Sequence, residues 1–125
     1  MLAFLTDKHI SHVIAEQVRQ KRADILIESV LRWRDGALRN LADDLLLAAA
    51  MVEGMTLVTY DQKTIPPILL ELAMCGGHHS GVVFVDRNAI VSSDIGGLVT
   101  ALIAFYDLHH GLDWTDIVMF LSPLS

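Results

Sequence analysis

Aspartates stand at three places in this chain where an α/β protein with a parallel sheet would bring them together. Asp7 and Asp61 each follow an apolar run rich in β-favouring residues. Asp43 and Asp44 open an apolar, alanine-rich stretch that predicts a helix. A helix in such a unit runs antiparallel to its strands, so its start lies at the edge where the strands end. We therefore expect three acidic positions at one edge of the sheet, the edge where open α/β sheets bind ligands.

Such a cluster indicates metal chemistry. Ionised carboxylates repel one another, and grouping them is costly unless cations are present. Carboxylate oxygens are the ligands that Mg²⁺ and Mn²⁺ prefer. A cation held in this way binds a phosphate oxygen and activates a water for in-line attack. The structural alternative is that these aspartates only cap and turn the backbone, which is common after strands and at helix starts.

Strands and helices alternate along the whole sequence, and this pattern must position the acids. Apolar runs predict strands over 2–6, 25–27 with an extension towards 30, 55–60, 81–85 and 117–121. Helices are predicted over 12–22, from 43 to Gly54, from 65 to the Gly76–Gly77 stop, and over 95–109. The last strand also allows a short helix, and 31–42 is ambiguous with a break at Gly36. The alternation predicts one domain over 1–125, with a mainly parallel sheet covered on both faces.

Individual residues mark the expected ends of the helices. Ser11 is suited to cap the first helix, and Asp94 precedes the last one. Gly54 ends the central helix in the way that glycine closes a helix in a left-handed turn. Pro66 and Pro67 fall in the first turn of the next helix, where proline is tolerated.

Composition narrows the class of protein. Hydrophobic residues make up 53% of 125 residues, which predicts one folded domain rather than a disordered chain. No apolar run is long enough to cross a bilayer, and the N-terminus lacks the basic region of a signal peptide. A single cysteine, Cys75, rules out an internal disulfide and favours a cytoplasmic location. The apolar content is high for so small a chain, which favours a homodimer.

The net charge of −6 argues against a strong non-specific nucleic-acid binder. A nuclease whose acids are offset by bound cations remains compatible with this charge. No phosphate-binding loop, GxGxxG or GxSxG pattern is present, so nucleotide-cofactor and serine-hydrolase functions have no support.

Four segments carry a resemblance to a known family: LTDKHIS from residue 5, DDLLLAAAMVEGMTLVTYDQKTIPP from residue 43, GVVFV from residue 81 and VMFLSPL from residue 118. Together they resemble the PIN-like domains of the small DUF5615 type, which are similar to the toxin nucleases of bacterial toxin–antitoxin pairs. The most specific part is an acid, an apolar helix with alanine, a glycine, and a strand ending LVTYD. The resemblance implies a three-layer α/β/α sandwich with a parallel sheet.

The resemblance also implies Mg²⁺- or Mn²⁺-dependent cleavage of RNA by acids that are both catalytic and metal-binding. By position these acids fall on Asp7 and Asp61, and the helix acid falls on Asp43. With Asp43 in that role, alanine and glycine take the expected later places in the helix. Asp44 is the adjacent candidate for a metal ligand, and the all-apolar helix gives no face with which to choose between them.

A fourth acid is open between Asp86, after the strand at 81–85, and Asp94, before the last helix. Each also has a structural interpretation as a turn or a cap. The residue after the first acid is Lys8, where the family often has an acidic or polar residue.

Basic residues near the acids are candidates for substrate binding. Lys8, His9 and Lys63 flank two of the acids and would bind substrate phosphates; the alternative is a solvated side chain. Thr59 either hydrogen-bonds near the acids or serves its strand alone. Paired histidines elsewhere lack the spacing of a zinc site and are expected to be ordinary surface or loop residues. Most of the positive charge lies in the first third, as an RNA-facing patch or a solvated face: Arg19, Lys21, Arg22, Arg32, Arg34 and Arg39.

Two functions from different classes follow. The first is a metal-dependent endoribonuclease, the toxin of a toxin–antitoxin pair, with an antitoxin protein as its partner. The second is a PIN-like binding or regulatory module that has lost catalysis. A receiver-type signalling domain is a distant third, because the acid pair expected directly after its first strand is missing.

Overall fold

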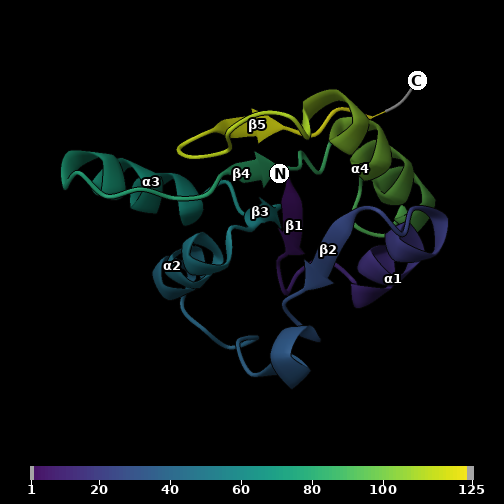
Figure 1. Ribbon diagram of the computed structural model, residues 1–125, viewed down its shortest axis with the longest axis horizontal. Coiled ribbons are helices and arrows are strands. Elements are labelled where there is room, and N and C mark those ends of the chain that lie inside the picture. The colour runs from purple at the N-terminus through teal and green to yellow at the C-terminus, as the bar shows by residue number, and fades with distance from the viewer. Residues whose placement is uncertain (1, 124–125) are drawn as a thin grey trace.

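The computed structural model describes residues 2–123 (Figure 1). Met1 and residues 124–125, which the predicted domain and the segment VMFLSPL include, lie outside the described residues. Helices and strands alternate in the order β1 (Ala3–Thr6), α1 (His12–Lys21), β2 (Leu26–Ser29), the 3₁₀ turn η1 (Trp33–Gly36), α2 (Asp43–Glu53), β3 (Thr56–Thr59), α3 (Ile65–Met74), β4 (Val82–Phe84), α4 (Ile95–His109) and β5 (Val118–Phe120).

The five strands form one parallel sheet in the order β2-β1-β3-β4-β5. Leu5 of β1 lies beside Leu57 of β3, and Val58 of β3 lies beside Val83 of β4. Every residue of β1, β3 and β4 is buried, which explains why these strands are unbroken apolar runs in the sequence. The predicted α/β fold with a parallel sheet is confirmed.

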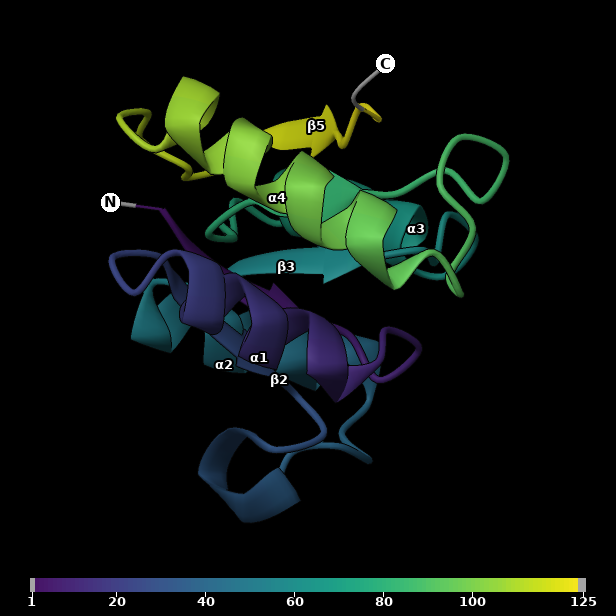
Figure 2. The ribbon, with the colours of Figure 1, turned by 90° about the vertical axis from the view of Figure 1, so that its right-hand side faces the viewer.

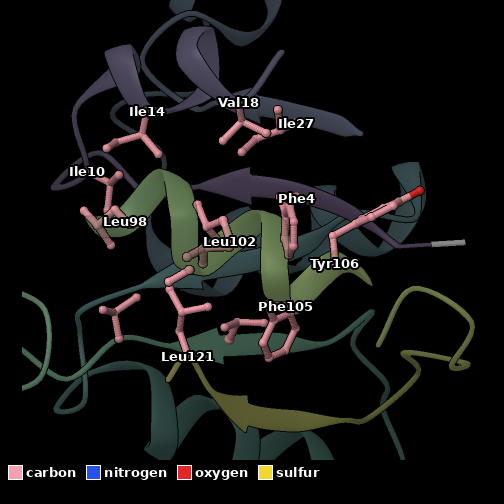
Figure 3. Packing of buried hydrophobic residues seen from close by; sticks show 14 of the residues in the cluster. Phe4, Ile10, Ile14, Val18, Ile27, Leu98, Leu102, Phe105, Tyr106 and Leu121 are labelled. Atoms are coloured by element: carbon pink, nitrogen blue, oxygen red, sulfur yellow. The ribbon is translucent and has the colours of Figure 1, made fainter. Parts of the chain in front are cut away.

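Helices cover both faces of the sheet and make a three-layer α/β/α sandwich. α1 and α4 lie on one face, and α2 and α3 lie on the other (Figures 1 and 2). Alternate residues of β1 point to opposite layers, so Phe4 packs with α1 and α4 while Leu5 packs with α2. Figure 3 shows the first of these cores, where Leu102 of α4 lies among side chains of α1 and β1.

The helix ends follow the predicted signals. The Ser11 side chain accepts a hydrogen bond from the Val13 amide, and the Asp94 side chain accepts one from the Gly97 amide. Gly54 closes α2 with a φ of 67°, the left-handed conformation that glycine adopts at little cost. The caps confirm the predicted helix boundaries to within a residue or two.

The structure adds to the sequence analysis in three regions: the segment 31–42, the loop before β4 and the last strand. The ambiguous segment 31–42 contains η1, with positive φ at Arg34 and Asp35 as well as at Gly36. His79 lies in the loop before β4, as one alternative of the prediction states, but it is buried, with 6% of its surface exposed. The His79 Nδ1 atom accepts a hydrogen bond from the Gly81 amide, which holds the ring inside this loop. The last predicted strand is a strand, β5, and not a short helix.

Candidate active site at the carboxyl edge of the sheet

The order of the strands fixes where a ligand would bind. β1 has β2 on one side and β3 on the other. The chain leaves β1 for α1 on one face of the sheet and leaves β3 for α3 on the other face, so the sheet has its topological switch point between β1 and β3. In open α/β sheets such a switch point, at the carboxyl ends of the strands, is where ligands bind. Asp7 follows β1 at this point, and Asp61 lies two residues after the end of β3. The Asp7 amide donates to the Val58 carbonyl at 3.0 Å, which ties the two strand ends together.

Asp7 is a buried carboxylate, with 3% of its surface exposed. Its Oδ2 atom accepts a hydrogen bond from the Thr59 hydroxyl at 2.7 Å, and its Oδ1 atom accepts one from the Lys8 amide at 2.5 Å. The same Thr59 oxygen accepts a hydrogen bond from the Asp61 amide at 3.0 Å. Thr59 therefore links the Asp7 carboxylate to the Asp61 backbone. This is the hydrogen-bonding role that sequence analysis offered as the alternative to a role in the strand alone.

Asp61 holds the start of α3. Its Oδ1 atom accepts hydrogen bonds from the amides of Lys63 and Thr64, at 2.9 and 2.8 Å. Burial acts to raise the pKa of Asp61, but hydrogen bonds from Thr64 and Lys63 outweigh it, and the pKa lies below its ordinary value. The structural interpretation of an aspartate after a strand therefore applies to Asp61, and the same contacts keep it ionised.

Asp43 has no such structural duty. Ala42, not Asp43, is the N-cap of α2, and no side chain caps this helix. The Asp43 side chain is half-buried, and burial is the largest cause of its raised pKa, followed by the negative charges of Asp7 and Asp61. The neighbouring Asp44 is exposed on the helix surface. Of the two adjacent candidates, Asp43 is the one that the structure brings into the field of the other acids.

The three acids do not form a ready-made coordination group. Among residues 2–123, no three His, Cys, Asp or Glu side chains are arranged to hold a metal ion. The donor chemistry nevertheless fits Mg²⁺ or Mn²⁺, because all three side chains supply hard oxygens. Both Asp7 oxygens accept hydrogen bonds, yet a carboxylate has about four lone-pair sites and retains the capacity to bind a cation. The raised pKa of Asp43 has mutual repulsion among its causes, and a bound cation would relieve it.

A hollow of about 640 Å³ lies beside the acids, over the ends of β3 and β4. Asp61, His9 and Lys63 line it, and Lys8 does not. The positive charges of Lys8 and His9 do act on Asp43 and lower its pKa, so both lie near the acidic centre. Asp86 also lines this hollow, so it is the better placed of the two candidates for a fourth acid. Asp94 instead caps α4.

Sequence analysis missed one residue of this hollow. Arg87 lines it, and its guanidinium lies 5.7 Å from the centre of the Tyr60 ring. Its position after a strand, directly beyond Asp86, is the same signal that identified the acids, and it could have found Arg87 as well.

Comparison of the chain with protein-family models, with curated proteins and with solved structures finds no match. The resemblance to PIN-like domains therefore stays a prediction from the sequence. Within residues 2–123, no helix combines the length and the apolar character needed to cross a membrane.

Proposed function

We propose that this protein is a PIN-like ribonuclease that cleaves RNA with the help of Mg²⁺ or Mn²⁺. The observation that carries the proposal is that acids from three separate elements lie near one another at the carboxyl edge of the sheet. The Thr59 hydroxyl joins the Asp7 carboxylate to the Asp61 backbone, and the charges of Asp7 and Asp61 contribute, after burial, to the raised pKa of Asp43. Grouped carboxylates lower the stability of the fold, so stability alone does not explain them. Carboxylates with perturbed pKa values at the ligand-binding edge of a sheet favour a functional site.

The chemistry follows from the side chains at the edge. Among residues 2–123, the acidic centre contains no serine or cysteine paired with a base, so the attacking group would be water rather than a side chain. A divalent cation, when bound, would supply the polarised phosphate oxygen and the activated water. Asp7, Asp43 and Asp61 would hold it, and Thr59 would keep the Asp7 carboxylate in place through its hydroxyl. His9 and Lys63 would bind the substrate phosphate from the adjoining hollow.

The proposal extends to the location, the partner and the oligomeric state of the protein. It would act in the cytoplasm as the toxin of a toxin–antitoxin pair and form a homodimer. Apolar side chains left exposed on α3 and β5, including Leu70, Met74 and Phe120, support a protein interface on that side of the molecule.

The second candidate is a PIN-like binding module without catalysis. One observation favours it: the acids lack a ready-made three-ligand arrangement within residues 2–123. In that case the exposed apolar surface would be the functional one and the acids would be a remnant. Cleavage of RNA separates the two candidates.

The test measures cleavage of a mixed pool of single-stranded RNA with Mn²⁺ and with chelator. Wild type should cleave only with metal. Asp43→Asn should lower the rate of cleavage by at least about 100-fold. It removes a carboxylate that would hold the cation, and the cation would stabilise the negative charge that develops on the phosphate in the transition state. Asp44→Asn is the matched control, since it removes the same charge one residue away, and it should retain most of the activity.

Two outcomes would count against the proposal. Cleavage that persists equally in Asp7→Asn and Asp61→Asn would indicate a contaminating nuclease. A folded wild type that cleaves no RNA under any divalent metal would favour the binding module.

A further inference from the structure

The arginines of the first third divide into two groups. Arg22 forms ion pairs with Asp24 and with Asp107 of α4, and Arg34 pairs with Glu53 of α2. These two arginines connect elements of the fold, so their charges are already matched. Their partners argue against treating the whole basic segment as one RNA-facing patch.

The second group surrounds a hollow of about 700 Å³ beside β2, the edge strand. Arg19, Arg32 and Arg39 line it together with two acids, Glu16 and Asp35. Arg19 is partly engaged, because it donates to the Ile27 carbonyl at 2.5 Å and lies 3.6 Å from Glu28.

Arg32 and Arg39 differ from the other arginines of this segment. Neither forms an ion pair with any carboxylate in the described part of the chain. Arg32 does contact the ring of His12 at 3.2 Å. A guanidinium without a carboxylate partner, facing an open hollow, is suited to bind a phosphate through two parallel hydrogen bonds.

This hollow adjoins the acidic centre on the side away from Asp61. Ser29, the last residue of β2, lines it and lies beside Thr6 in the register of the sheet. Thr6 directly precedes Asp7. The hollow that contains Lys63 and Arg87 lies on the other side, over β3 and β4, and neither of these two residues forms an ion pair within residues 2–123.

Two hollows therefore flank Asp7, and each contains two cations that form no ion pair within residues 2–123, although each hollow is also lined by two acids. Neighbouring strands are about 4.8 Å apart, so the strand ends from β2 to β4 span about 14 Å. A net charge of −6 repels a polyanion in general, and binding then depends on local positive sites. A ligand with several phosphates in a row fits this arrangement, whereas a single phosphate would engage only one hollow.

We infer that a single strand of RNA crosses the carboxyl edge of the sheet, with one phosphate held by Arg32 and Arg39 on the β2 side and another held by Lys63 and Arg87 on the β4 side. The inference rests on the proposed function, because that function supplies the RNA. It adds the path of the strand and three arginines that bind it. The two-sided contact places the bond to be cleaved inside the strand rather than at its end.

The test measures binding rather than cleavage, so a failure of catalysis leaves it intact. A fluorescein-labelled single-stranded RNA of twelve nucleotides is titrated with the full chain in chelator, and the Kd is read from fluorescence anisotropy. Arg39→Ala and Arg87→Ala should each weaken binding by about tenfold, since each removes a charge-assisted contact to phosphate. The double variant should lose about the product of the two factors, because the hollows are separate and contact one strand.

Lys21→Ala is the matched control, because Lys21 is an exposed cation that lines neither hollow. Its Kd should stay within about twofold of wild type, as expected for loss of a distant surface charge. Each lost phosphate contact should also reduce the slope of log Kd against log salt by about 0.7. Circular dichroism checks that every variant is folded.

The inference would be overturned if wild type failed to bind the RNA at low salt. It would equally be overturned if folded Arg39→Ala and Arg87→Ala bound like wild type, or if Lys21→Ala weakened binding as much as they do.

Discussion

Two helices on opposite faces of the sheet, α3 and α4, have similarly apolar sequences, yet they pack very differently. α4 buries six residues against the sheet and α1, namely Leu98, Val99, Ala101, Leu102, Phe105 and Tyr106. α3 is just as apolar in sequence but buries only Ile65. Its Leu70 and Met74 are 63% and 79% exposed. Figure 1 shows the consequence, with α4 lying along α1 and α3 reaching outward on the opposite side.

The candidate site belongs mostly to the layer that contains α2 and α3. Asp43 begins α2, and Asp61 holds the start of α3 through the amides of Lys63 and Thr64. Only Asp7 precedes a helix of the layer that contains α4, namely α1. Two of the three acids therefore lie at the starts of helices in the layer whose helix α3 buries only Ile65, and elements near a ligand site commonly come from the less stable part of a fold.

The largest expected effect is a difference in the free energy of unfolding between a variant of α4 and a variant of α3. Leu102→Ala removes a side chain that is 1% exposed in the α1–α4 core, and it should lower the free energy of unfolding by about 2–5 kcal/mol. Leu70→Ala makes the same chemical change on α3, where it leaves no cavity, and should cost less than about 0.5 kcal/mol. Urea unfolding followed by circular dichroism measures both.

Equal losses of unfolding free energy in the two variants would contradict this difference in packing, because they would show that α3 packs in solution as tightly as α4. A large loss from Leu70→Ala alone, growing with protein concentration, would instead place this side chain in a subunit interface.

The smallest expected effect concerns Asp43 in the metal-free protein. Its folded pKa is raised above the ordinary value of 3.8, so the folded state binds the proton more tightly than the unfolded state. The carboxylate therefore destabilises the fold once pH rises through the folded pKa, and this penalty is absent below pH 3.8. Asp43→Asn should make the protein slightly more stable at pH 7, by less than about 1 kcal/mol, and the gain should vanish at low pH.

Chemical denaturation of wild type and Asp43→Asn across pH, in chelator, measures the difference in their free energies of unfolding. A variant less stable than wild type at neutral pH would mean that Asp43 supports the fold and is not held there at a cost.

Most of the fold could be predicted from sequence because its three central strands, β1, β3 and β4, are fully buried. Such strands are short runs of apolar and β-branched residues, and Ser11, Gly54 and Asp94 mark the helix ends by local chemistry that needs no tertiary information. The segment 31–42 resisted prediction because its path depends on positive φ at Arg34 and Asp35, which side-chain type does not signal.

The site was only partly predictable for a different reason. The carboxyl edge follows from the order of strands and helices, so the positions of Asp7 and Asp61 could be placed in advance. The choice between Asp43 and Asp44 could not, because α2 is apolar nearly all round and only its contacts decide which acid turns inward. The unmatched charge of Arg39 was equally hidden, since ion-pair partners such as Asp107 for Arg22 and Glu53 for Arg34 are distant in sequence.

The most direct test of the acidic centre is the position of a bound divalent cation. Crystals grown with Mn²⁺ and measured at a wavelength where manganese scatters anomalously would locate the ion without reference to activity. The account predicts one strong peak among the carboxylates of Asp7, Asp43 and Asp61, and loss of that peak in crystals of Asp61→Asn. Manganese bound only elsewhere, such as beside His78 and Asp116, with none at the carboxyl edge, would contradict it.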